Sequence, residues 1–190
     1  MNMTFLMVVI LVFLCVWLYS VYTGLIQKRN KVQEAFSSID VQLKKRYDLI
    51  PNILTIAQKY IDHEKGLLEE ITKLRNQALS LAGKMENIDK KIALDSEISR
   101  KMGQIMVTVE NYPEIKADQP MMTAMKTYNE VEEHIAAARR FYNSAALELK
   151  NTVEIFPGSI VASIMNIQAV EFFNVDEKER QVINASDYLK

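Results

Sequence analysis

The side chains that most often carry catalysis or bind metals are few in this chain. It has one cysteine, Cys15, and two histidines, His63 and His134. The pair His63–Glu64 begins like a zincin motif, but position 67 is leucine where the second histidine would stand. A helical di-iron site needs a glutamate three residues before each of two histidines, and neither histidine has one. The sequence therefore predicts no metal site.

Nucleophilic catalysis finds no better support. The single cysteine lies within an apolar run, and the chain contains no G-x-S-x-G elbow and no phosphate-binding P-loop. One cysteine also excludes a disulfide within the chain. We therefore predict no catalytic residues, no cofactor and no small-molecule substrate, and we expect a protein that is not an enzyme.

The N-terminal region predicts a membrane anchor. Residues 5–26 contain no charged side chain and, as a helix, would measure about 33 Å, enough for a hydrocarbon core of about 30 Å. A cleaved signal peptide would need a basic segment before the run and a small-residue cleavage site after it, and the sequence shows neither. We predict a transmembrane helix over 5–26 that follows a short extracytoplasmic segment, 1–4.

Basic residues on one flank predict the orientation. Lys28, Arg29 and Lys31 follow the span and none precedes it, so the positive-inside rule places the rest of the chain in the cytoplasm. A periplasmic domain is the alternative. We expect these three side chains to contact lipid headgroups. Residues 27–60 carry seven basic and three acidic side chains, although the whole chain has a formal net charge of −1. This balance argues against nucleic acid as a partner and favours an anionic leaflet.

The remaining residues have the periodicity of amphipathic helices. Apolar residues recur at spacings of three and four over 32–81, 88–109 and 121–156, and Ser159 is expected to cap a last short helix. Pro51 predicts a kink within the first stretch, not its end. A helix over 27–83 would be about 85 Å long. The fold class is therefore all-α: an elongated antiparallel bundle of three to four long helices over 27–173, with a polar tail or strap over 174–190.

Charged residues on the apolar stripes suggest a polar layer. Glu132 and Arg139 fall on the stripe of their helix, and buried charges are costly unless they are paired. We hypothesise that they join other polar side chains, within one chain or between chains. The candidate partners are Arg46, Asp48, Asn52 and Arg75. For the basic cluster 44–46, the alternative is helical i,i+4 pairing with Asp40 and Asp48.

Several strings in the sequence resemble a known family. Residues 39–46 read IDVQLKKR, 48–52 read DLIPN and 63–64 read HE, and later come ENYP at 110–113, RRFYN at 139–143 and FP at 156–157. These strings are similar to the LemA family of bacterial membrane proteins. The chain departs from the family at 167–170, which reads IQAV where a Gly-Phe pair is usual. The resemblance implies an all-helical domain on an N-terminal anchor, with that domain in the cytoplasm, and it implies no reaction.

These observations predict a non-enzymatic helical scaffold at the bacterial cytoplasmic membrane. We expect it to form a homo-oligomer or to recruit a protein partner through a helix face. The alternative is a lipid-binding or membrane-shaping module that acts through its basic membrane-proximal helix. A metal-dependent enzyme ranks third.

Overall fold

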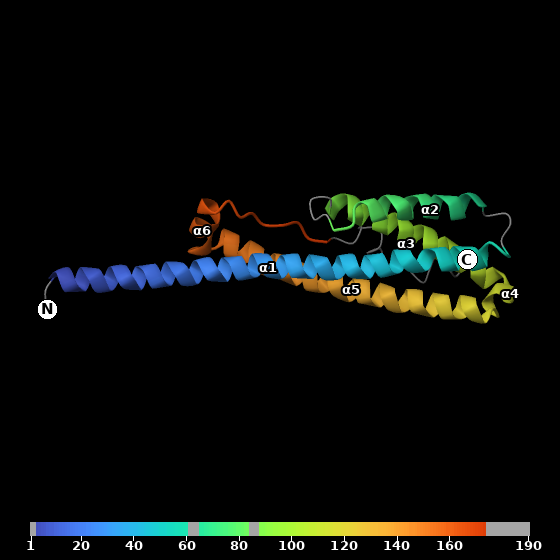
Figure 1. Cartoon of the computed structure of the whole chain (residues 1–190), viewed down its shortest axis with the longest axis horizontal. Helices are drawn as coiled ribbons and strands as arrows, with labels where there is room; N and C mark the ends of the chain where they lie inside the picture. Colours follow the sequence, from blue (N-terminus) through green and yellow to red (C-terminus); the bar gives the residue numbers. More distant parts are fainter. Residues whose placement is uncertain (1–2, 61–64, 84–87, 174–190) are drawn as a thin grey trace, which may run out of the picture. The chain divides into compact units, whose positions relative to one another are not determined.

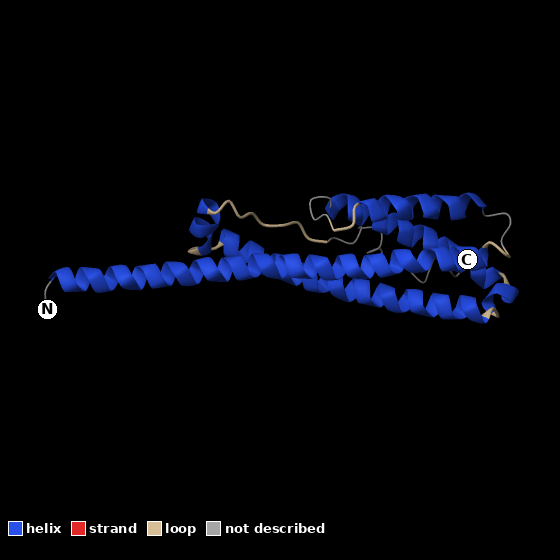
Figure 2. Cartoon of the chain, in the orientation of Figure 1, coloured by secondary structure: helices blue, strands red, loops and turns tan. Residues whose placement is uncertain are grey.

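The structure is a computed structural model that describes residues 3–60, 65–83 and 88–173. Every regular element in these ranges is a helix, and they contain no strand (Figures 1 and 2). The helices are α1 (Met3–Ala57), α2 (Lys65–Ser80), α3 (Ile88–Asn111), α4 (Pro113–Lys116), α5 (Gln119–Glu154) and α6 (Gly158–Ile164). The prediction of an all-α fold that begins with a long apolar helix is confirmed.

The chain divides into two compact units that share α1 and α5. The first unit contains α1 up to Val41 together with Ile135–Phe172, and the second contains the described residues of Gln42–His134 together with Phe173.

In the second unit, α1 and α5 run antiparallel. The Tyr60 hydroxyl donates to Asp118 Oδ2 at 3.2 Å, whereas Arg46, earlier in α1, contacts Glu132, which is later in α5. Helices α2 and α3 pack against each other along their lengths. The core between these helices is apolar. Its fully buried members include Ile50, Ile53, Ile71, Ile98, Met102 and Ile105.

In the first unit, the later half of α5 runs back toward the N-terminal end of α1. Lys31 pairs with Glu148, and Lys28, one turn earlier, donates to Thr152 Oγ1 at 2.6 Å. Helix α6 then folds against the end of α5 through Gly158. A Cβ at this position would lie 2.1 Å from the Thr152 carbonyl oxygen, so only glycine allows this approach.

The predicted continuous helix over 27–83 is wrong. Helix α1 ends at Ala57, residues 58–60 form a turn with short-range bonds such as Tyr60 N–H to Ala57 O, and α2 begins at Lys65. The apolar residues of both helices face one core, so their spacing continues nearly in phase across the break. Periodicity alone therefore does not reveal the turn.

Two local predictions have different outcomes. Pro51 lies inside α1, which continues to Ala57, so the proline does not end the helix; the kink itself stays a prediction. Ser159 does not cap α6, because the helix already includes Gly158 and its N-cap residue, Pro157, makes no side-chain cap. Positions 63–64, 1–2 and the tail 174–190 lie outside the described residues.

Candidate functional site

A buried arginine lies at the centre of the second unit. Arg46 is 0% exposed and occurs on the apolar stripe of α1, between Leu43 and Ile50. A buried guanidinium is tolerated only when acceptors surround it, because its charge has lost its water. The structure supplies these acceptors from two other helices.

Two carboxylates flank Arg46. Its Nη2 pairs with Asp95 of α3, which is also 0% exposed, and its Nη1 lies 2.7 Å from Glu132 Oε1 of α5. The side chain of Glu132 retains 34% exposure, so it forms the solvent side of this buried triad. Residues from α1, α3 and α5 are thus joined at one level of the unit.

Neutral groups complete the surroundings. Arg46 Nη1 donates to Ser99 Oγ at 2.9 Å, and the Tyr47 hydroxyl lies 3.4 Å from Asp95 Oδ1. Burial raises the pKa of Tyr128 far above its ordinary value of 10.0, although the Arg46 cation opposes this rise. Arg46 Nε has no acceptor among the described residues, so hydrogen bonds satisfy the guanidinium only in part.

Arg75 replaces a backbone hydrogen bond that Pro51 removes from α1. Proline has no N–H, so the carbonyl of Tyr47, four residues before it, loses its helical partner. Arg75 Nε of α2 donates to that carbonyl at 2.5 Å, and its Nη2 lies 3.9 Å from Asp48 Oδ1. The proline and the arginine therefore act together to fix α2 against α1.

The structure brings some of the predicted polar residues together and not others. It pairs Glu132 with Arg46 and places Arg75 near Asp48. Asn52 is exposed, and Arg139 is half-buried in the first unit. Asp95 was not among the candidates, although an aspartate at an apolar-stripe position between Ile92 and Ile98 was a signal that could have found it.

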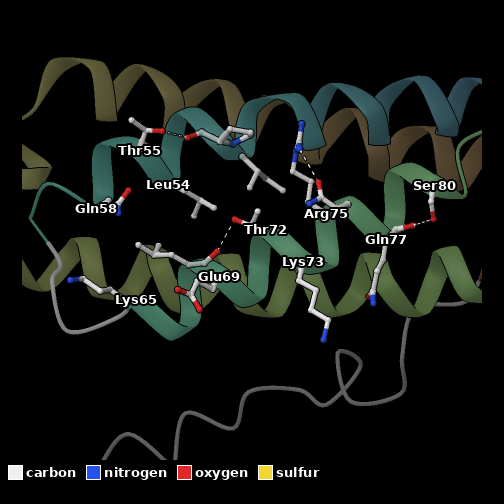
Figure 3. A pocket seen from close by; sticks show the side chains of 14 residues that line it. Leu54, Thr55, Gln58, Lys65, Glu69, Thr72, Lys73, Arg75, Gln77 and Ser80 are labelled. Carbon is white, nitrogen blue, oxygen red and sulfur yellow. Dashed lines mark hydrogen bonds between the residues drawn. The ribbon is translucent and has the colours of Figure 1, made fainter.

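A groove runs between α1 and α2 beside this region (Figure 3). Its volume is about 940 Å³, and Leu54 of α1 and Thr72 of α2 lie on facing sides of it. Its lining mixes aliphatic residues with lysine, glutamate and amide side chains. None of the lining residues is a cysteine or a histidine.

The basic flank of the apolar run is partly engaged by α5. Lys28 donates to Thr152, and Lys31 Nζ contacts both oxygens of Glu148 at 2.9 and 3.0 Å. The hydrogen bond from Lys31 holds the pKa of Glu148 below its ordinary value of 4.5. Arg29 is exposed. The three predicted headgroup contacts thus occupy different environments.

The apolar run itself is not covered by the described residues. Positions 3–20 of α1 are all exposed, and this helix is long and apolar enough to cross a membrane. Among the described residues no group of three or more histidine, cysteine, aspartate or glutamate side chains could hold a metal ion. Cys15 and His134 are both exposed, in α1 and α5 respectively.

Comparison with known proteins extends these observations. The model of the LemA family matches residues 35–186. The chain is 27% identical over 177 residues to Protein LemA of Metamycoplasma hominis, covering 89% of this chain and 78% of the relative. It is also 21% identical to Magnetosome protein MamQ 1 of Paramagnetospirillum magneticum and 20% identical to Magnetosome protein MamQ of Magnetospirillum gryphiswaldense. Each alignment covers 80% of this chain, but the chain spans only 64% of either magnetosome protein. Together with the apolar helix, these relatives support a membrane-associated helical protein.

Proposed function

Because the chain belongs to the LemA family, we propose that it is a non-enzymatic, membrane-anchored helical scaffold that self-associates or recruits partners at the cytoplasmic membrane. The observation that carries this proposal is the exposure of the whole apolar run 3–20 on a helix that continues into the bundle. Such a surface needs a cover, because exposed contiguous apolar patches of this kind mark membrane or protein contacts.

The energy of insertion supports lipid as the cover for this run. Residues 5–18 include eleven leucine, isoleucine, valine or phenylalanine side chains and no charge. At about −0.3 to −0.6 kcal/mol for each at the centre of a membrane helix, they favour insertion by about 3–7 kcal/mol.

The state of the charged residues supports a structural role. Arg46 and Asp95 are both fully buried and paired with each other, so neither is available to a substrate. Buried ion networks of this kind are best known for setting register and partner choice. This favours a scaffold over a catalyst.

The mass of the particle extracted in mild detergent tests self-association. The chain alone weighs 21.9 kDa. We expect light scattering, corrected for bound detergent, to give a discrete multiple of that mass. Two differently tagged copies expressed together should also purify as one complex. A monomer that fails to capture the second tag would refute the self-association.

Labelling of an introduced cysteine tests the proposed orientation, with the bundle in the cytoplasm. In a Cys15→Ser background, Ser38→Cys places the sole thiol at an exposed site of α1 beyond the basic flank. A membrane-impermeant maleimide should leave it unlabelled in intact cells and should label it once the inner membrane is permeabilised. Labelling in intact spheroplasts would instead place the bundle in the periplasm.

The exposure of Arg29 favours a second candidate function, lipid binding through the basic flank. Reversing all three basic residues would be ambiguous, because Lys28 and Lys31 also contact α5. Arg29→Glu isolates the headgroup interaction, and Lys31→Glu serves as the control that breaks a contact within the chain. If lipid binding is the function, R29E should abolish the preference for anionic vesicles and leave the oligomeric mass unchanged. An unchanged lipid preference would remove this candidate.

A further inference from the structure

The turn after α5 and the short helix α6 expose a second apolar surface. Its members are 41% to 78% exposed and come from one short segment of the first unit. They are Ile155, Phe156, Ile160, Ile164 and Met165, and we call this surface the apolar tip. Ile160 and Ile164 are four residues apart on α6, whereas Gly158 and Ala162 of the same helix are buried. Helix α6 is therefore amphipathic, with its apolar outer face uncovered.

The sequence around the apolar tip carries no charge. Residues 155–170 contain no aspartate, glutamate, lysine or arginine, a property otherwise characteristic of the N-terminal run. A solvent-facing tip of a soluble bundle would normally carry charged residues, because they keep such surfaces from associating. The backbone at the end of α6 is hydrogen-bonded, from Met165 N–H to Val161 O and from Ile167 N–H to Ala162 O. Satisfied backbone groups are what a segment needs if it is to enter an apolar medium.

The apolar tip lies beside the predicted span. The ring of Phe156 is 6.5 Å from the ring of Trp17, measured between centroids. Trp17 lies nine residues before Ile26, the end of the predicted span, which is about 14 Å along a helix. Figure 1 shows α6 alongside α1 within this unit. The tip therefore lies next to the apolar run and not beyond its charged end.

The polar contacts between α5 and α1 lie at the charged end of the predicted span, just before the apolar tip. Lys28, at the charged end of the span, donates to Thr152, just before the tip, and Lys31 contacts Glu148 one turn further back. The charged residues of α5 end at Glu154, whose carboxylate lies 3.9 Å from Lys150 one turn earlier, and the uncharged segment begins at Ile155. This is the order expected where a protein crosses from the headgroups into the acyl region.

We infer that the apolar tip inserts into the membrane beside α1, so that two separate segments of the protein contact the bilayer. The occupant of this surface is lipid, because the tip is continuous with the apolar run. This inference rests on the proposed anchoring by α1. The tip adds a second contact with lipid, which fixes the rotation of the first unit about the span; a single helix leaves this rotation undetermined.

Fluorescence quenching in the full chain, reconstituted in vesicles of phosphatidylcholine and phosphatidylglycerol, tests the insertion. Ile164→Cys in a Cys15→Ser background is labelled with the environment-sensitive dye NBD. Because Ile164 is 78% exposed, this substitution should leave the packing of α6 undisturbed. Lipids with a spin label on the acyl chain should quench this probe at least about twofold more than the same probe at Ser38→Cys, the matched control on α1. The emission of the Ile164 probe should also be blue-shifted.

Trp17, the only tryptophan, reports on the anchor without any substitution. Quenching of Trp17 by brominated lipids, with no quenching of the Ile164 probe, would overturn the inference and leave the anchoring intact. Absence of quenching at both sites would overturn both. The emission of the Ile164 probe could instead be blue-shifted without quenching by lipid and shift back to longer wavelength when unlabelled chains dilute the labelled ones. That result would assign the tip to a contact with a second copy and would also overturn the inference.

Discussion

Removal of Asp95 should destabilise the second unit strongly. Asp95→Ala deletes a carboxylate that is fully buried against Arg46, and it leaves the guanidinium with Glu132, a partner that is one-third exposed. Loss of one member of a buried ion pair costs about 3–5 kcal/mol, because the other charge stays buried without compensation. Alanine is the best helix former, so local helix propensity offsets part of the loss and does not add to it.

The matched control lies two residues further along α3. Glu97 pairs with Arg100 on the surface, with side chains 44% and 58% exposed, and such pairs are worth about 0.2–1 kcal/mol. Thermal unfolding of the full chain in mild detergent, followed by far-UV circular dichroism, measures both variants. At about 4 °C per kcal/mol, D95A should lower Tm by roughly 12–20 °C, against about 4 °C or less for Glu97→Ala.

A second substitution distinguishes an uncompensated charge from lost packing. Arg46→Met in the D95A background removes the buried cation and keeps an aliphatic chain of similar length, so the double variant should be more stable than D95A alone. Glu132 can then turn to water. Two results would refute the reasoning: a D95A loss no larger than that of Glu97→Ala, or a double variant in which the two losses simply add.

Two further predictions concern the contacts between helices. Arg75→Ala should cost about 1–2 kcal/mol in urea unfolding, because the Tyr47 carbonyl would lose the hydrogen bond from Arg75. This loss should shrink in a Pro51→Ala background that restores the helical N–H; equal losses in the two backgrounds would contradict the link. Lys31→Met should return the pKa of Glu148 toward 4.5 in an NMR titration. The pKa of Glu148 is lower in the folded state, so the contact stabilises the protein at pH values above the unfolded-state pKa, and this stabilisation is lost as pH falls through the folded-state pKa. The wild type should therefore lose more stability than K31M on acidification below about pH 4.5. Parallel acid profiles of the two proteins would be the contrary result.

Periodicity was enough to predict the helices of the bundle, because each buries one face and its apolar residues repeat accordingly. The charge-free run was enough to predict that the chain begins with a long apolar helix. It was not enough to place the turn after Ala57, which contains no proline and where the stripe of α2 resumes almost in phase with that of α1. The glycine and proline that do mark an end stand at 157–158, where α5 indeed gives way to α6.

The buried triad shows what one-dimensional patterns contain and what they lack. Glu132 was visible as a charge on an apolar stripe, and Asp95 carried the same signal on α3. Arg46 was one of four candidate partners for Glu132 and also part of a basic cluster, and the sequence could not choose between these roles, because the burial of Arg46 depends on which helices face it. The donation from Arg75 to the Tyr47 carbonyl was beyond prediction for the same reason, since it requires the relative register of α1 and α2.

The arrangement of the triad also bears on how the second unit folds. Its three charges come from positions 46, 95 and 132, on helices that are not consecutive in the chain. The α1–α2 hairpin alone contains Arg46 without either acid, and the α2–α3 hairpin alone contains Asp95 without Arg46, so each single hairpin leaves a charge without its partner. Intermediates built from one hairpin are therefore disfavoured, and the full set of carboxylate partners of Arg46 is present only when α5 docks. A truncated chain that ends before α5 should consequently be less stable than the complete chain, because it lacks one of the two carboxylates that pair with Arg46.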